Sequence, residues 1–223
     1  MSTPGTKTIP IAVFASGRGS NFDAIHSAIR AKQLDAEIVA VVSDQPNSLV
    51  LEKARRAGLK TLAIEAEKGA SARKDHEEKI LKALKPLAPK FLVMAGYMRI
   101  VTPHLLDAFR SERGYNRVVN IHPSLLPAFP GVDAYARAFN YGAKITGVTV
   151  HLVDEEVDGG PVCVQESFLI GDCRSVSEVE SWGLALEHRL FPKTLSWVLP
   201  EEFEIDIRSG QRPEQRRICV RSH

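Results

Sequence analysis

The sequence has few cysteines, no long hydrophobic run and no excess of charge of one sign. Its three cysteines, Cys163, Cys173 and Cys219, are odd in number and form no Cys-x-x-Cys pair. Neither a disulfide framework nor a zinc site is therefore expected. This cysteine usage fits a reducing compartment.

The hydrophobic segments are too short for a membrane protein. None reaches the ~18 consecutive apolar residues of a transmembrane helix, and residues 1–10 lack the apolar stretch of a signal peptide. We therefore expect a cytoplasmic protein with no membrane partner.

The charges nearly cancel. Lys and Arg total 29 against 27 Asp and Glu, which leaves a formal net charge of +2. Such a balance gives no global field that would imply a nucleic-acid partner. A basic run extends from Arg208 to Arg221, but a basic terminus is more often a solvated end than a binding arm.

The composition that remains is that of a globular protein. Of the 223 residues, 44% are hydrophobic and 25% are charged, and a chain of this length can bury one sizeable core. No internal repeat or low-complexity linker divides it. We expect one domain over residues 9–200, with a disordered extension at residues 1–8 and a tail at residues 201–223.

Short runs rich in Val, Ile and Ala alternate with helical patterns, which predicts βαβ units. The expected strands are residues 9–16, 37–43, 60–65, 91–95 and 118–121, and the expected helices are residues 21–32, 48–57, 72–84 and 103–110. A helix at 133–141, two segments at 147–153 and 162–170 that pair antiparallel, and a long helix at 176–198 complete the pattern. The predicted fold class is α/β: a single-domain, Rossmann-like, mostly parallel twisted sheet with helices on both faces and an antiparallel C-terminal portion.

Ligands of such sheets bind beyond the carboxyl ends of the strands. The loop after the first strand reads Ser16-Gly17-Arg18-Gly19-Ser20-Asn21, and its glycines and the helix start that follows suit a phosphate. Phe22 stands where a dinucleotide fingerprint needs its third glycine, and no Gly-Lys-Ser/Thr follows. The alternative is a turn in which Ser20 or Asn21 simply caps the helix. A nicotinamide site with Asp44 on the ribose is a minor alternative.

The fifth strand ends in Asn120-Ile121-His122-Pro123-Ser124. Because side chains alternate along a strand, Asn120 and His122 share a face while Ile121 points into the core. An amide and an imidazole side by side can stabilise an oxyanion, and the imidazole can move a proton. A polar pair that anchors the Pro-rich loop is the alternative.

The turn between the two late strands, residues 154–161, is acidic and contains Asp158-Gly159-Gly160-Pro161. Asp and Gly suit turn geometry, so the turn alone needs no function. A carboxylate brought near His122 would, however, hold the ring in one tautomer and favour its protonated form.

At these segments the sequence closely resembles the glycinamide ribonucleotide (phosphoribosylglycinamide) formyltransferases, a folate-dependent family of purine synthesis. The resemblance runs in order over about residues 9–200. The stretches that carry it are Ser16–Asn21, Ala95-Gly96-Tyr97-Met98-Arg99-Ile100, Asn120–Pro127, Gly147-Val148-Thr149-Val150-His151 and Asp158–Pro161. Asn-x-His-Pro-Ser with a later Asp is typical of the formyltransferase superfamily.

The resemblance implies transfer of a formyl group from 10-formyltetrahydrofolate to the amine of glycinamide ribonucleotide, giving phosphoribosyl-N-formylglycinamide and tetrahydrofolate without a metal. By this likeness Asn120 and His122 stabilise the tetrahedral oxyanion, and Asp158 pairs with His122 and relays the proton. Both partners are small molecules, and the protein is expected to be a monomer or a homodimer.

The same likeness divides the binding residues between an N-terminal half for the nucleotide and a C-terminal half for folate. The likeness implies that Gly17, Arg18, Gly19, Ser20 and Asn21 bind the nucleotide phosphate and that Glu187 binds the ribose hydroxyls. The likeness implies that folate is bound by Arg73, Met98, Arg99, Ile100, Val101, Asn120, Val153, Asp154 and Asp158. The backbone from Val153 to Asp158 is expected to hydrogen-bond the pterin. Of these, Arg73 and Glu187 are otherwise expected on solvated helix faces.

The sequence departs from the family at two places. Asp133 stands where many relatives carry a histidine, and Ser111 to Arg117 is several residues longer than usual, which a surface loop can absorb. The alternatives are a formyltetrahydrofolate hydrolase, a non-catalytic folate- or nucleotide-binding module, a methionyl-tRNA formyltransferase and a nicotinamide oxidoreductase. We do not expect the hydrolase, which carries an additional N-terminal regulatory domain, because the predicted catalytic domain begins by Ile9.

Overall fold

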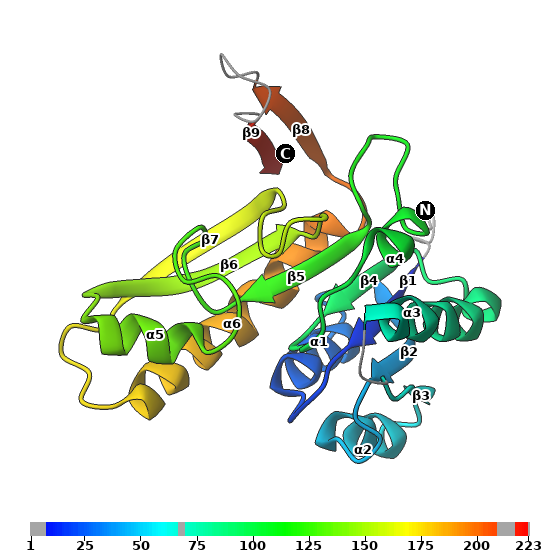
Figure 1. Cartoon of the computed structure of the whole chain (residues 1–223), viewed down its shortest axis with the longest axis horizontal. Coiled ribbons are helices and arrows are strands. Elements are labelled where there is room, and N and C mark those ends of the chain that lie inside the picture. The colour runs from blue at the N-terminus through cyan, green and yellow to red at the C-terminus, as the bar shows by residue number, and fades with distance from the viewer. Residues whose placement is uncertain (1–7, 67–69, 209–216, 223) are drawn as a thin grey trace, which may run out of the picture.

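The structure, a computed structural model, describes residues 8–66, 70–208 and 217–222. Seven strands form one sheet in the order β3-β2-β1-β4-β5-β6-β7 (Figure 1). They are β1 (Ile9–Phe14), β2 (Ala36–Ser43), β3 (Thr61–Ala63), β4 (Phe91–Met94), β5 (Val118–His122), β6 (Ile145–Leu152) and β7 (Val162–Leu169). Strands β1 to β5 are parallel, whereas β6 pairs antiparallel with both β5 and β7. The α/β class and the antiparallel pair are confirmed.

Helices cover both faces of the sheet. They are α1 (Ser20–Arg30), α2 (Leu49–Arg56), α3 (Ala70–Leu84), α4 (Pro103–Asp107), α5 (Ala134–Tyr141) and α6 (Val176–Val198), with a 3-10 turn at Lys85–Leu87. Along β1, Ile11 and Val13 belong to the core that α1, α2 and α6 cover, whereas Ala12 and Phe14 belong to the core under α3 and α4. Because side chains alternate along the strand, β1 contributes residues to the hydrophobic core on each face of the sheet.

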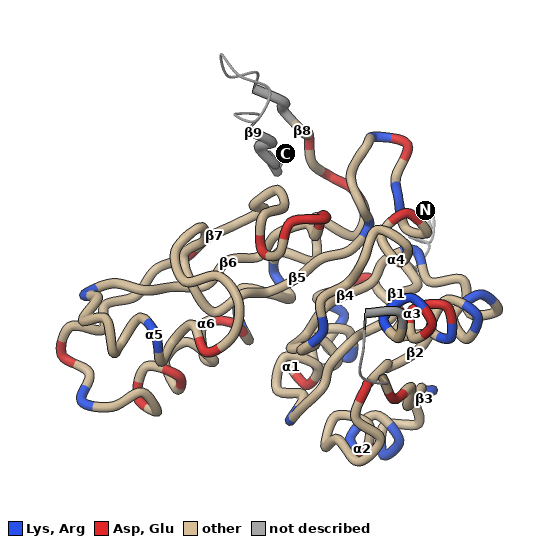
Figure 2. The backbone as a smooth tube through the Cα atoms, viewed as in Figure 1, with Lys and Arg blue, Asp and Glu red and all other residues tan. Residues whose placement is uncertain are grey.

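Two helix boundaries carry the local signals that the sequence predicts, whereas α4 ends at Asp107 rather than at the expected Arg110. Thr102 Oγ1 accepts a hydrogen bond from the amide of His104 at the start of α4. Gly58, just past α2, has a φ of +73°, a conformation that glycine adopts without a steric penalty. Acidic and basic residues are interspersed along the backbone, and both signs lie close together in α3 (Figure 2).

The end of the chain differs from the plain tail expected at residues 201–223. Strands β8 (Phe203–Arg208) and β9 (Arg217–Ser222) form a separate antiparallel two-stranded sheet. Phe203 is 1% exposed and belongs to the main core, so the packed domain extends past residue 200. The basic side chains from Arg208 onward, and residues 1–7 of the expected extension, lie outside the described side chains.

The longer segment from Ser111 to Arg117 is only partly a surface loop. Its Tyr115 and Asn116 are buried, and the Tyr115 ring lies 5.2 Å from that of Phe203. Tyr115 of this segment therefore packs against β8, because burial of an aromatic side chain removes a large apolar area from water. Within the described ranges, no helix combines the length and hydropathy needed to cross a lipid bilayer.

Candidate active site

A cavity of about 540 Å³ opens beyond the carboxyl ends of β4 and β5. Three segments contribute most of its wall: the connection after β4, the end of β5 and the turn between β6 and β7. Its lining includes Met98, Arg99, Ile100, Val101, Asn120, His122, Asp133, His151, Val153, Asp154 and Asp158. The volume suits a small organic ligand.

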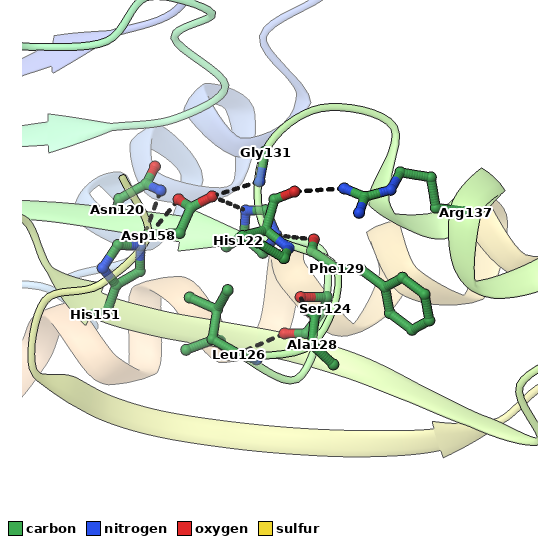
Figure 3. Close-up of polar contacts among 12 residues, drawn as sticks. Asn120, His122, Ser124, Leu126, Ala128, Phe129, Gly131, Arg137, His151 and Asp158 are labelled. Atoms are coloured by element: carbon green, nitrogen blue, oxygen red, sulfur yellow. Dashed lines mark hydrogen bonds and ion pairs between the residues drawn. The ribbon is translucent and has the colours of Figure 1, made fainter. Parts of the chain in front are cut away.

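The end of β5 places two polar side chains at this cavity. Asn120 and His122 are register partners of His151 and Thr149 on β6. Asn120 contacts His151, and Asp158 lies within 4 Å of both His122 and His151, while Ile121, which also borders the cavity, is 7% exposed and belongs to the core. The predicted shared face of Asn120 and His122 is confirmed (Figure 3). It follows from the alternation of side chains along a strand.

Asp158 lies against His122. Its Oδ2 is 3.4 Å from Nδ1 of His122 and accepts a 2.7 Å hydrogen bond from the amide of Gly131. On the other side of the ring, Nε2 lies 3.0 Å from the carbonyl oxygen of Phe129. Both ring nitrogens therefore face oxygens: the contact with Phe129 is a hydrogen bond when Nε2 carries a proton, and the contact with Asp158 is an ion pair when the ring is protonated. The pair can serve as an acid.

Sequence reasoning gave no role to His151, which the structure places beside Asn120. The Nδ1 of His151 lies 3.1 Å from the carbonyl oxygen of Leu152, and its Nε2 lies 3.1 Å from Nδ2 of Asn120. Burial lowers the pKa of His151. A neutral ring with its proton on Nδ1 then accepts from Asn120 and fixes the amide. The contact depends on the register between β5 and β6, which pairs Asn120 with His151 and cannot be read from either segment alone.

The predicted folate residues converge on the cavity, with one exception. Met98, Arg99, Ile100 and Val101 all line it, and the Met98 and Ile100 side chains are 71% and 52% exposed. Arg73 is not among the lining residues and lies on the exposed side of α3, next to a small space that Arg99 also borders.

The first loop is tied to this wall by hydrogen bonds. Ser16 Oγ accepts from the amide of Met98 at 2.9 Å and donates to Oδ1 of Asp44 at 2.6 Å. Asp44 is 7% exposed, and its other oxygen accepts from Gln45. Asp44 therefore anchors the loop. Because both of its carboxylate oxygens already accept hydrogen bonds, the alternative in which Asp44 binds a ribose is disfavoured.

The loop itself begins α1 without a side-chain cap. Gly19 is the N-cap residue with a φ of +71°, and a Cβ there would lie 2.6 Å from Cγ2 of Val50. Neither Ser20 nor Asn21 caps the helix, so the capping alternative is wrong. Among the described residues, the amides of positions 17–22 have no backbone acceptor, and such amides at a helix start suit an anion.

Asn21 turns inward to Glu187. Its Nδ2 donates to Oε2 of Glu187 at 2.6 Å, and the hydroxyl of Tyr135 donates to Oε1 at 2.8 Å. Glu187 is 6% exposed, and this burial raises its pKa. Neither Glu187 nor the loop at 16–21 lines the 540 Å³ cavity, so the structure does not unite all predicted site residues in one space.

Asp133 occupies the residue before α5 with a φ of +56°. Its side chain is exposed and borders the cavity. Within the described part of the chain, no group of three or more His, Cys, Asp or Glu side chains is arranged to hold a metal ion.

Comparison with known proteins gives a consistent result. Residues 9–195 match the family model described as formyl transferase. The phosphoribosylglycinamide formyltransferase of Bacillus subtilis is 37% identical over 188 residues, which are 84% of this chain and 93% of that protein. The crystal structure of glycinamide ribonucleotide transformylase 1 from Symbiobacterium toebii has a TM-score of 0.83 and 32% identity, with 96% of this chain and 94% of that chain covered. That of phosphoribosylglycinamide formyltransferase from Bacillus halodurans has a TM-score of 0.80 and 39% identity, with 85% and 95% covered.

Proposed function

The chain belongs to the formyl transferase family, and we propose that it transfers a formyl group from 10-formyltetrahydrofolate to the amine of phosphoribosylglycinamide in purine biosynthesis. The observation that carries this proposal is the convergence of Asn120, His122 and Asp158 on one cavity from two separate segments. The likeness to phosphoribosylglycinamide formyltransferases supports the choice of acceptor.

The folate donor would occupy the 540 Å³ cavity. Met98, Ile100 and Val101 offer apolar surface to a flat ring system, and the backbone from Val153 to Asp158 offers donors and acceptors to a pterin. This combination of an apolar wall with a few polar groups is typical of sites for aromatic heterocycles. Arg73 would reach only the distal carboxylates of such a donor, because it lies outside the cavity.

The nucleotide acceptor would bind at the loop after β1. Amides at positions 17–21 would hold its phosphate, since they lack backbone acceptors and lie at the positive N-terminal end of α1. Glu187 would accept from the ribose hydroxyls with the lone pairs that Asn21 and Tyr135 leave free.

The reaction needs groups that hold an oxyanion and move one proton. The acceptor amine attacks the formyl carbon, a new C–N bond forms, and the carbonyl oxygen becomes an oxyanion. Nδ2 of Asn120 has a second N–H besides the one directed to His151, and it would donate to that oxygen together with His122. The bond to the folate nitrogen then breaks. That nitrogen takes up a proton, and the amine loses one, through the His122–Asp158 pair and water.

The substrates proposed are small molecules, without a nucleic-acid or membrane partner, in the cytoplasm. The test follows the loss of the formyl group from 10-formyltetrahydrofolate spectroscopically, with and without phosphoribosylglycinamide. Loss that requires the amine is the expected result. Equal loss without it would indicate a hydrolase, and no loss in either case would leave a binding module.

A further inference from the structure

A buried tyrosine joins α5 to the carboxylate of α6. Tyr135 is 7% exposed and Glu187 is 6% exposed, and the tyrosine hydroxyl lies 2.8 Å from Oε1 of the carboxylate. Asn21 approaches Oε2 from α1. Two helices that are distant in sequence, α1 and α5, therefore direct donors at one carboxylate of α6. Neither the sequence motifs nor the reaction scheme above uses Tyr135.

The position of Tyr135 is fixed by packing. A Cβ on Gly183 of α6 would overlap Cζ and Oη of Tyr135, so the tyrosine ring fills the space that this glycine leaves. The Phe168 ring packs at 6.2 Å on another side. Burial raises the pKa of Tyr135, so the hydroxyl stays protonated and acts as the donor.

The surroundings of Glu187 show what the two donors do. Burial raises its pKa, while the hydrogen bonds from Asn21 and Tyr135 oppose that rise and favour the ionised form. The other titratable groups that act on the carboxylate are His188 from α6 and His122 from β5. A carboxylate that lost one donor would more readily take up a proton, and it would then be a poorer acceptor.

We propose that Tyr135 is a positioning residue for the nucleotide acceptor: its hydroxyl holds Oε1 of Glu187 so that the free lone pairs of the carboxylate receive vicinal ribose hydroxyls. This inference rests on the proposed function. The geometry supports it, because Asn21 and Tyr135 each use one lone pair of a different oxygen and leave one on each.

The test is Tyr135→Phe, which keeps the ring against Gly183 and removes only the hydroxyl. Calorimetric titration of the enzyme with phosphoribosylglycinamide, without folate, should give a Kd about tenfold weaker, the size expected for one hydrogen bond to a charged acceptor. The KM for the nucleotide should rise similarly, while kcat and the KM for the folate donor stay near wild type. Tyr141→Phe is the matched control on α5, because the Tyr141 side chain is 82% exposed.

A second variant reaches the same hydroxyl from the opposite side. Gly183→Ala places a methyl group where Tyr135 now lies, so it should displace the tyrosine hydroxyl and weaken nucleotide binding although residue 135 is still tyrosine. Unchanged nucleotide affinity in folded Tyr135→Phe would overturn the inference, and so would an equal loss of affinity for the folate donor, which would indicate a general loosening. If the wild-type enzyme itself does not bind phosphoribosylglycinamide, the proposed function fails first.

Discussion

Oδ2 of Asp158 lies 3.4 Å from Nδ1 of His122 and also accepts the amide of Gly131. One carboxylate thus joins the end of β5 to the connection that leads into α5. Asp158 adopts a φ of +56°, which Asp and Asn tolerate better than most residues. This conformation aims the side chain from the exposed turn at the imidazole.

Asp158→Asn should fold nearly normally and lower kcat by about a hundredfold or more, because the neutral amide no longer pairs with a protonated His122 or helps to relay its proton. Steady-state kinetics and urea unfolding together measure this. Asp172→Asn, at an exposed position beyond β7, serves as the control. Near-normal turnover in Asp158→Asn would remove Asp158 from the mechanism.

Gly19→Ala and Gly58→Ala form a matched pair. Both glycines have a positive φ, but only a Cβ at Gly19 meets a neighbour, Val50. Gly58→Ala should therefore cost about 1–2 kcal/mol of unfolding free energy, from backbone strain alone. Gly19→Ala should cost about 1–3 kcal/mol more, because the loop must also shift. Equal losses in urea unfolding would show that the contact with Val50 relaxes freely.

The same shift should reach the nucleotide. Gly19→Ala moves the amides of positions 17–21, so its Kd for phosphoribosylglycinamide should weaken far more than its Kd for the folate donor. Calorimetry with each ligand separately measures the two effects. Equal weakening of both ligands would contradict the assignment of the phosphate to this loop.

Glu187→Gln should make the protein more stable at neutral pH and less able to bind the nucleotide. Because the folded pKa of Glu187 is raised, keeping it ionised costs stability that grows as pH rises above the ordinary value of 4.5. The new amide can donate to Oδ1 of Asn21, a buried acceptor without a partner among the described residues, once the Asn21 amide rotates.

Urea unfolding of wild type and Glu187→Gln at pH 4 and pH 7 measures this effect. The stability advantage of the variant should be larger at pH 7, where Glu187 of the wild type is more fully ionised. A variant that is less stable than wild type at pH 7 would show that the two hydrogen bonds of Glu187 outweigh its desolvation.

Stability should also fall on acidification because of His151. Its folded pKa lies below the ordinary 6.5, so the unfolded chain binds more protons, and stability present above pH 6.5 is lost as pH falls below that value. His76, whose pKa is lowered in the same direction, adds to the loss. His151→Gln should lose less stability between pH 7.5 and 5.5 than wild type, and a double variant with His76→Gln should lose less still. A wild-type slope in both variants would contradict the buried, neutral state of these rings.

Several features of the site follow from local sequence. The two-residue period of β5 predicts that Asn120 and His122 share a face, and the structure agrees. The Gly-rich stretch at 16–21 predicts a tight loop between β1 and α1, and in the structure Gly19 has a positive φ. The antiparallel pair of β8 and β9 was missed, because the segment at the end of the chain in which it lies is rich in charged residues.

The sequence by itself determined the alternation of strands and helices, the face that Asn120 and His122 share, and the glycine loop, because each depends on neighbours a few residues apart. The family likeness implied that Asp158 pairs with His122, and the structure places the two side chains 3.4 Å apart. Only the tertiary structure decided that His151 lies beside Asn120 and that Tyr135 lies on Glu187. These contacts depend on strand register and on the packing of helices across the core. No local periodicity encodes which distant side chains the folded chain brings into contact.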